Sequence, residues 1–219
     1  MLPDLVNQKL NVLVACEESQ TSCIAFRNLG CNAFSCDIQS STGGHPEWHI
    51  CSDVLSILNG NCNFITESGD YHFIKKWDLI LAHPPCTYLA ASSATCLFPN
   101  HKLNIDRYNK LLAARDFFFK IWTSNCEHIC IENPRPLSIA KLPRPSDVVD
   151  PSDFGSKYHK RTYLWLKNLP PIIITGTNPN AKSFVYTRSG SKNRSKSDYL
   201  MYNAIASQFV SFLTSYCYA

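Results

Sequence analysis

The stretch from residue 77 to residue 86, WDLILAHPPC, decides the fold class. Its apolar run, Trp77–Ala82, is short and continuous, which is typical of a strand that is buried on both faces of a parallel sheet. His83 and two prolines follow at once. Because each proline fixes φ and removes a backbone donor, the chain must leave the strand in a stiff loop. We therefore expect Cys86 to be held at the edge of the sheet and not in the core.

Similar apolar runs alternate with helical patterns along the chain, which predicts an α/β fold. No linker divides the sequence, so we expect one Rossmann-like domain over residues 1–219, with a mostly parallel sheet and helices on both faces. The expected strands are Asn11–Ala15, Ala33–Cys36, Trp77–Ala82, His128–Ile131, Arg161–Leu166 and Phe184–Tyr186. The expected helices are Thr21–Leu29, Ile105–Ser124 and Tyr199–Tyr216, with loops at Gln39–Trp48 and Pro134–Pro151.

Composition excludes several classes of protein. With 45% hydrophobic residues the chain can bury a core, and no apolar run approaches the ~20 residues that cross a bilayer. The first residues do not form a signal peptide, so we expect a cytoplasmic protein with no membrane partner. The 11 cysteines are odd in number and form no Cys-x-x-Cys pair. We therefore expect reduced, structural thiols and no metal site.

Charge is divided unevenly along the chain. Residues 1–100 carry 4 Lys and Arg against 9 Asp and Glu, whereas residues 101–219 carry 17 against 8. The first half, at −5, is suited to a small cofactor, and the second half, at +9, is suited to a polyanion.

Polar residues follow three of the expected strands. Asp37 ends the second strand, His83–Cys86 follows the strand at 77–82, and Glu132-Asn133 ends the strand at 128–131. In open α/β sheets, ligands bind outside the carboxyl ends of the strands. The three strand ends therefore predict one shared crevice.

Together these residues resemble the cytosine-5 DNA methyltransferases. That family carries a Pro-Pro-Cys loop, a later Glu-Asn pair and an arginine just ahead of a strand. The matching segments here are Pro84-Pro85-Cys86, Glu132-Asn133 and Lys160-Arg161-Thr162-Tyr163. The chain is most similar to the short members encoded by bacteriophages and prophages, through residues 14–17, 44–49 and 82–88. The match extends from about residue 10 to residue 213.

The resemblance implies a class I methyltransferase fold, S-adenosylmethionine as cofactor and DNA as partner. It implies that Cys86 adds to C6 of cytosine, that Glu132 contacts N3 and that Arg161 contacts O2. The cofactor residues that we expect are Cys16, Glu17, Asp37, Asp53, His83 and Asn203, the last of them ahead of the final helix. The expected substrate-binding residues are Pro85, Asn133, Lys160, Arg188, Lys192, Arg194 and Lys196.

Two features depart from the family pattern. The first loop, Ala15–Ser19, has no glycine where the family is rich in glycine. Only residues 167–198 occupy the place of the target-recognition region, so that region is reduced or absent. Three functions stay open: cytosine-5 methylation of DNA, the same chemistry on a free nucleotide or single-stranded nucleic acid, and a binding protein that no longer turns over. A methyltransferase acting on an amino group fits less well, because such enzymes have an aromatic residue in place of Cys86.

Overall fold

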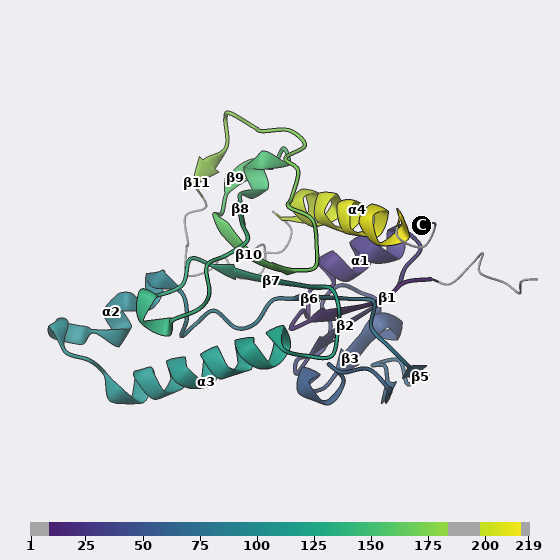
Figure 1. Cartoon of the computed structure of the whole chain (residues 1–219), viewed down its shortest axis with the longest axis horizontal. Helices are drawn as coiled ribbons and strands as arrows, with labels where there is room; N and C mark the ends of the chain where they lie inside the picture. The colour runs from purple at the N-terminus through teal and green to yellow at the C-terminus, as the bar shows by residue number, and fades with distance from the viewer. Residues whose placement is uncertain (1–8, 184–197, 216–219) are drawn as a thin grey trace, which may run out of the picture.

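The central feature of the protein is one seven-stranded, mostly parallel sheet (Figure 1). The computed structural model describes residues 9–183 and 198–215. The strand order is β3-β2-β1-β6-β7-β10-β8, and every pair from β3 to β7 is parallel. β10 runs antiparallel to both β7 and β8. The bounds are β1 Asn11–Ala15, β2 Asn32–Asp37, β3 His49–Cys51, β6 Leu79–Ala82, β7 Ile129–Pro134, β8 Asp147–Val149 and β10 Thr162–Lys167.

The two faces of the sheet are covered by different helices, because alternate residues of a strand point to opposite faces. In β1, Val12 and Val14 pack in a core with residues of α1 (Thr21–Asn28) and α4 (Tyr199–Ser215). Leu13 and Ala15 pack in a second core with residues of α3 (Ile105–Trp122). Figure 1 shows α1 and α4 on one side of the sheet and α3 on the other. The predicted α/β class and mostly parallel sheet are confirmed.

Short elements complete the described chain. The remaining strands are β4 Cys62–Ile65, β5 Tyr71–Ile74, β9 Tyr158–His159 and β11 Lys182–Ser183, and the remaining helix is α2 Ala94–Leu97. Turns of 3-10 helix lie at Pro46–Trp48, Val54–Ser56, Ala91–Ser93, Pro99–His101, Ser138–Ala140 and Pro151–Asp153. β4 and β5 form an antiparallel hairpin, and β9 and β11 pair separately from the main sheet.

Sequence reasoning missed β3, the β4–β5 hairpin, β8 and the two-residue strand β9, and it did not place β11 at Lys182–Ser183. The proline-rich segment 134–151 was expected to be irregular, but its end forms β8, which pairs with β10 at the border of the sheet. β3 and β8 have only three residues each, which is too short for a period-2 pattern to be recognised. The strand expected at Phe184–Tyr186 lies outside the described residues.

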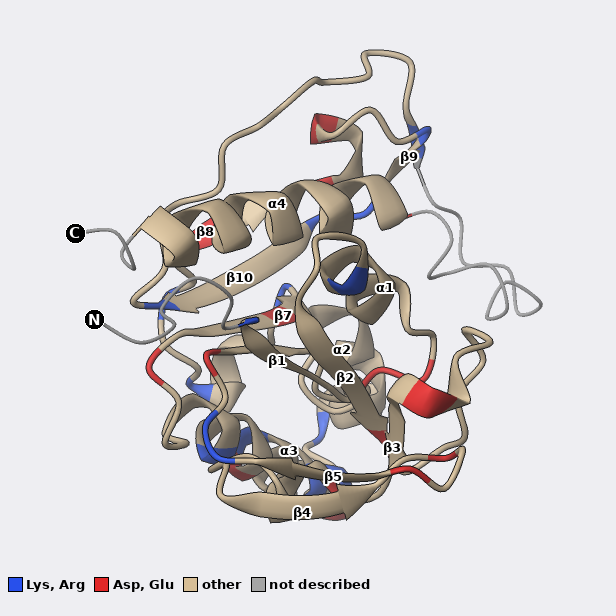
Figure 2. Ribbon diagram, turned by 90° about the vertical axis from the view of Figure 1, so that its right-hand side faces the viewer, with Lys and Arg blue, Asp and Glu red and all other residues tan. Residues whose placement is uncertain are grey.

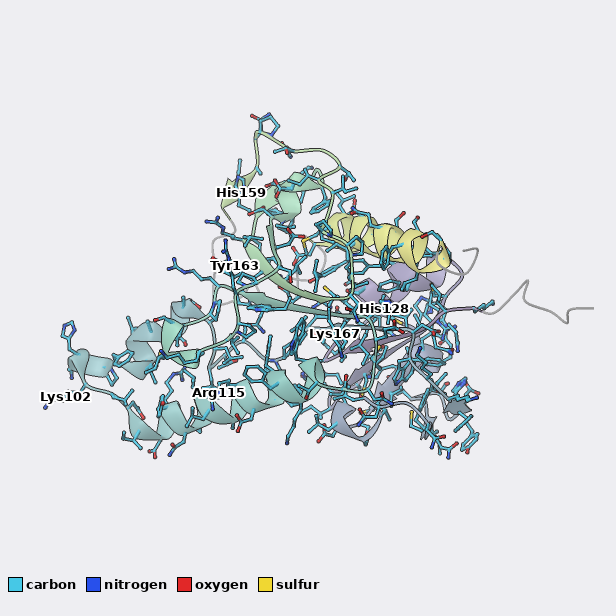
Figure 3. The ribbon with its side chains drawn as sticks, in the orientation of Figure 1. Lys102, Arg115, His128, His159, Tyr163 and Lys167 are labelled. Atoms are coloured by element: carbon cyan, nitrogen blue, oxygen red, sulfur yellow. The ribbon has the colours of Figure 1, made fainter. Side chains whose placement is uncertain are left out.

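The strand order places a crevice at the carboxyl edge of the sheet. From β1 the chain moves outward to β2 and β3, and it later returns to β6 on the other side of β1. The carboxyl ends of β1 and β6 therefore flank a topological switch point, where such sheets bind ligands. In Figure 3, His128 and Lys167 mark the amino edge of β7, and Tyr163 at the start of β10 lies toward the carboxyl edge.

Candidate functional site

A cleft of about 570 Å³ lies at this carboxyl edge. Four residues predicted from the sequence line it: Cys16 after β1, Asp37 at the end of β2, Asp53 after β3 and Pro85 after β6. The structure thus brings together residues from four consecutive parallel strands of the sheet. The volume of the cleft lies within the range of small-molecule sites in proteins.

The two carboxylates of the cleft also order the loops that carry them. Asp37 Oδ1 accepts a hydrogen bond from the Gln39 amide at 2.9 Å, and Asp53 Oδ1 accepts one from the Leu55 amide at 3.0 Å. Burial, Asp37 and Asp53 together raise the pKa of the Cys16 thiol to about 12. Cys16 therefore lines the cleft as a neutral thiol. Figure 2 shows acidic residues, in red, gathered around β2, β3 and β5.

Sequence reasoning missed the apolar walls of the cleft. Ile38, Val54 and Phe117 line it, and the Ile38 side chain is 77% exposed directly after β2. An exposed large apolar residue beside two acids offers a flat ligand both a surface to cover and groups that accept hydrogen bonds. Phe117 comes from α3, which no local sequence signal connects with the strand ends. Tyr88 and Lys110 line the cleft as well.

The glycine-free loop after β1 turns with two non-glycine residues in left-handed conformations. Cys16 has φ 61°, and Gln20 just before α1 has φ 59°. The Gln20 side chain donates to the His45 carbonyl at 2.8 Å and accepts from the His45 amide at 3.0 Å. The loop that contains His45 therefore holds this turn in place.

Glu17 does not line the cleft, contrary to the role expected for it. It is 5% exposed, and its two carboxylate oxygens accept hydrogen bonds from the Ser22 and Cys23 amides at 2.7 and 3.1 Å. Glu17 therefore binds the amides at the start of α1, where the helix dipole favours a negative charge. The physical reason is that these amides have no partner within the helix, and a carboxylate four residues upstream of Thr21 can reach them.

His83, expected at the cofactor, does not line the cleft and contacts Glu132 of the Glu-Asn pair. Its Nδ1 lies 3.1 Å from Glu132 Oε2, and its Nε2 lies 3.2 Å from Ser22 Oγ. The His83 and Glu132 side chains are 14% and 10% exposed. Burial lowers the pKa of His83, but the hydrogen bond and the charges of Glu132 and Glu17 outweigh it, so that the pKa lies above its usual value.

Asn133 fixes the backbone of the Pro-Pro-Cys loop. Asn133 Nδ2 donates a hydrogen bond to the Pro84 carbonyl at 2.8 Å, and Asn133 is 1% exposed. Among the described residues, no group hydrogen-bonds to Asn133 Oδ1, which is buried. A buried acceptor without a donor costs about 1–3 kcal/mol, so a donor from a ligand or from water would stabilise this atom.

Cys86 is partly exposed and lies two residues beyond the carbonyl that Asn133 binds. Its own carbonyl accepts hydrogen bonds from the Leu89 and Ala90 amides at 3.0 and 2.8 Å, which forms a turn. Pro85, the preceding residue, is exposed and faces the cleft. The nucleophile predicted from the sequence therefore directly follows a residue that lines the cleft, in a loop whose Pro84 carbonyl is bound by Asn133.

The Lys160-Arg161 segment reaches the same edge. Because β10 is antiparallel to β7 and Thr162 pairs with Pro134, the exposed Arg161 lies next to the carboxyl end of β7. Lys160 forms an ion pair with Asp198, which is 2% exposed. Lys160 thus joins the start of β10 to the residue before α4.

Asn203 was assigned to a place ahead of the last helix, and this is wrong: the expected helix Tyr199–Tyr216 and the observed α4 both contain it. Asn203 is exposed and does not line the cleft, because α4 packs with α1 on the face opposite α3. The predicted substrate residues Arg188, Lys192, Arg194 and Lys196 lie outside the described residues.

Within the part of the chain that the structure describes, no three His, Cys, Asp or Glu side chains are grouped as metal ligands would be. No helix in that part is both long and apolar enough to span a membrane. No protein-family model and no curated protein sequence matches this chain.

Proposed function

We propose that the protein transfers a methyl group from S-adenosylmethionine to C5 of cytosine in DNA. In this proposal Cys86 is the nucleophile, Glu132 contacts N3 and Arg161 contacts O2 of the base. The fold would then be a Rossmann-like class I methyltransferase, to which the mostly parallel sheet with helices on both faces corresponds.

One observation carries the proposal. The loop with Cys86 is joined to the Glu132-Asn133 pair twice, through His83 Nδ1 to Glu132 Oε2 at 3.1 Å and through Asn133 Nδ2 to the Pro84 carbonyl at 2.8 Å. The two segments lie 49 residues apart in the sequence. In this proposal the Cys86 thiol and the Glu132 carboxyl group, carried by two segments that are joined next to a ligand cleft, would act on opposite sides of one small ring.

The chemistry needs both groups. C5 of cytosine is a poor nucleophile until a thiolate adds at C6 and gives C5 enamine character. A carboxyl group at N3 stabilises the negative charge that this addition drives toward the ring nitrogen. The Arg161 guanidinium, exposed at the same edge, would stabilise charge at O2.

We propose that this cleft binds S-adenosylmethionine, which would supply the methyl group as an electrophile. Asp37 and Asp53 would accept hydrogen bonds from ribose hydroxyls and the adenine amine, and Ile38 and Phe117 would cover the adenine ring. Glu17 already binds the amides at the start of α1. The cofactor's own carboxylate would therefore bind elsewhere in the cleft.

A cytosine within a duplex cannot reach Cys86, so a duplex substrate would be flipped out of the helix. The +9 charge of residues 101–219 would attract the phosphates of the DNA. This half includes Arg188, Lys192, Arg194 and Lys196, for which we propose phosphate contacts with little base readout.

The test is methyl transfer from labelled S-adenosylmethionine to duplex DNA, single-stranded DNA and deoxycytidine nucleotides in parallel. We expect transfer to DNA by the wild-type protein and none by Cys86→Ser, because the alcohol does not add to C6. With DNA that contains 5-fluorocytosine, the wild type should form an adduct that survives denaturation. Cys96→Ser is the matched control, because Cys96 is an exposed free thiol on α2, and it should retain activity.

The outcomes separate the candidate functions. Transfer to free nucleotides alone would change the substrate and keep the chemistry. Binding of S-adenosylmethionine without transfer to any of the three substrates would identify a binding protein. An adduct that forms equally well with Cys86→Ser would show that another residue is the nucleophile.

A further inference from the structure

A buried row of polar groups runs beneath the Pro-Pro-Cys loop. Glu132 Oε2 lies 3.1 Å from His83 Nδ1, and His83 Nε2 lies 3.2 Å from Ser22 Oγ. The Ser22 amide in turn donates to Glu17 Oε1 at 2.7 Å. Both nitrogens of the His83 ring are therefore engaged, one of them with the carboxylate that would contact the base.

The charges around His83 favour its protonated form. Glu132 from β7 and Glu17 from the loop after β1 are the acids that face it, and Lys160, ahead of β10, opposes them. From α4 the Tyr202 ring packs edge-on against the imidazole, with ring centroids 5.2 Å apart. Although burial lowers the pKa of His83, the two acids raise it above its usual value. The His83–Glu132 pair thus keeps a proton to a higher pH than a free imidazole does.

We propose that His83 is a positioning residue that stores, beside Glu132, the proton that the cytosine ring takes up at N3. This inference rests on the proposed methyl transfer. It assigns to His83 a role in substrate protonation in place of cofactor binding.

In one catalytic cycle the proton moves from the His83–Glu132 pair to N3 of the base and then back to the pair. When Cys86 Sγ bonds to C6, the C5–C6 π pair forms a C4–C5 double bond and the C4–N3 π pair takes a proton from Glu132. Glu132 receives that proton from His83 Nδ1, so the pair supplies one proton in all. When C5 takes the methyl group, the bond of the methyl carbon to sulfur breaks and the sulfur keeps the electron pair. The C5 proton then leaves to water and the Cys86 thiolate leaves C6. N3 returns its proton through Glu132 to His83.

The position of His83 connects this proton to the nucleophile. His83 directly precedes Pro84-Pro85-Cys86, and Asn133 holds the carbonyl of Pro84. The same loop therefore aligns the proton store and the thiol. A neutral side chain that only donates a hydrogen bond could orient Glu132 equally well, but it could not supply a proton. This difference allows the storing role to be distinguished from a structural one.

The first experiment is an NMR titration of the imidazole ¹⁵N signals, which requires no activity. The His83 signals are identified by their absence in His83→Asn. We expect His83 in the wild type to titrate above the ordinary value of about 6.5. In Glu132→Gln it should titrate at a lower pH, because burial persists and the charge is removed. Titration below 6.5 in both proteins would overturn the proposal.

The second experiment compares the kinetics of His83→Asn with the wild type. We expect kcat at pH 8 to fall about 100-fold, within the range for lost proton transfer, with KM unchanged. The variant's kcat should rise as the pH falls, because Glu132 must then be protonated without help. The matched control is His128→Asn, because His128 lies at the amino edge of the sheet (Figure 3). This variant should keep the kcat and the pH profile of the wild type.

The two proposals fail in different ways. A wild type that methylates cytosine, together with a His83→Asn variant of equal kcat and equal pH profile, overturns only the role of His83. A wild type that transfers no methyl group to any substrate overturns both. Circular dichroism shows whether His83→Asn folds. If it does not fold, the comparison of the wild type with Glu132→Gln decides. The His83 signals are then assigned by through-bond NMR correlations to the next residue, Pro84.

Discussion

At the residue scale, the turn after β1 is built from side chains that replace the freedom of glycine. Cys16 and Gln20 both have left-handed backbone angles, which cost non-glycine residues about 1–2 kcal/mol each. Gln20 is held by two hydrogen bonds to the His45 backbone. The absence of glycine therefore does not prevent a tight turn, because a packed neighbouring loop stabilises it.

The prediction at this scale concerns Gly43, which packs against that turn. A Cβ atom on Gly43 would lie 2.5 Å from Gln20 Cβ and 2.7 Å from the Ser19 carbonyl oxygen. We expect Gly43→Ala to lower the free energy of unfolding by about 1–3 kcal/mol, because the backbone must move to relieve the overlap. Denaturant unfolding measures the change.

Gly176→Ala is the control, because a Cβ there meets no atom within 4 Å. It should change the free energy of unfolding by less than about 0.5 kcal/mol. Equal stability of the two variants would show that the loop carrying Gly43 does not pack on the turn.

At the element scale, the direction of β10 decides which of its ends reaches the site. In a parallel strand, residues at the carboxyl end would lie at the cleft edge. β10 is antiparallel to β7, so its start lies there and brings Arg161 next to the end of β7. The Lys160–Asp198 ion pair joins this corner to α4. One reversed strand thus adds a cation to an edge where β2 and β7 supply acids.

The prediction at this scale separates the two sides of α4. Phe209 is fully buried between α4 and the sheet, so Phe209→Ala should lower the free energy of unfolding by about 3–5 kcal/mol. Asn203 is exposed on the same helix. Asn203→Ala should therefore leave both stability and the affinity for S-adenosylmethionine unchanged, as measured by denaturation and calorimetry. Weaker cofactor binding by Asn203→Ala would contradict its placement away from the cleft.

At the scale of the whole molecule, the buried acids and His83 connect stability with pH. The folded pKa values of His83 and Glu17 both lie above their ordinary values. At these two groups the folded protein therefore binds more protons than the unfolded chain, and their contribution to stability falls as the pH rises. For Glu17 the loss begins near pH 4.5, and for His83 it begins near pH 6.5 and ends at the raised pKa.

We therefore expect the free energy of unfolding to decrease from pH 6.5 upward through the pKa of His83. Each unit by which the folded pKa exceeds 6.5 contributes about 1.4 kcal/mol. His83→Asn should remove this part of the slope, because asparagine does not titrate. Urea unfolding at a series of pH values measures it. Equal slopes for the two proteins in this range would show that the His83 pKa is not raised by folding.

The sequence alone determined the α/β class, the positions of β1, β2, β6, β7 and β10 within a few residues, and the helices α1, α3 and α4. Continuous apolar runs specify strands that are buried on both faces, and Pro84-Pro85 stiffens the loop with Cys86. These signals lie in neighbouring residues, so they can be read locally. Asp37 could be assigned to a cleft because it ends a strand in a sheet whose edge is shared, whereas Asp53 was assigned only through the family resemblance, since β3 was not predicted.

Only the tertiary structure decided the partners of Glu17 and His83. Glu17 binds the amides of α1, and His83 contacts Glu132 across 49 residues. A polar side chain in a crowded site binds the donor or acceptor that the packing brings to within about 3 Å. Because a buried polar group must be hydrogen-bonded, burial requires such a partner. Sequence spacing contains no such distances, so the contacts of Glu17 and His83 exist only once the sheet and its helices are assembled.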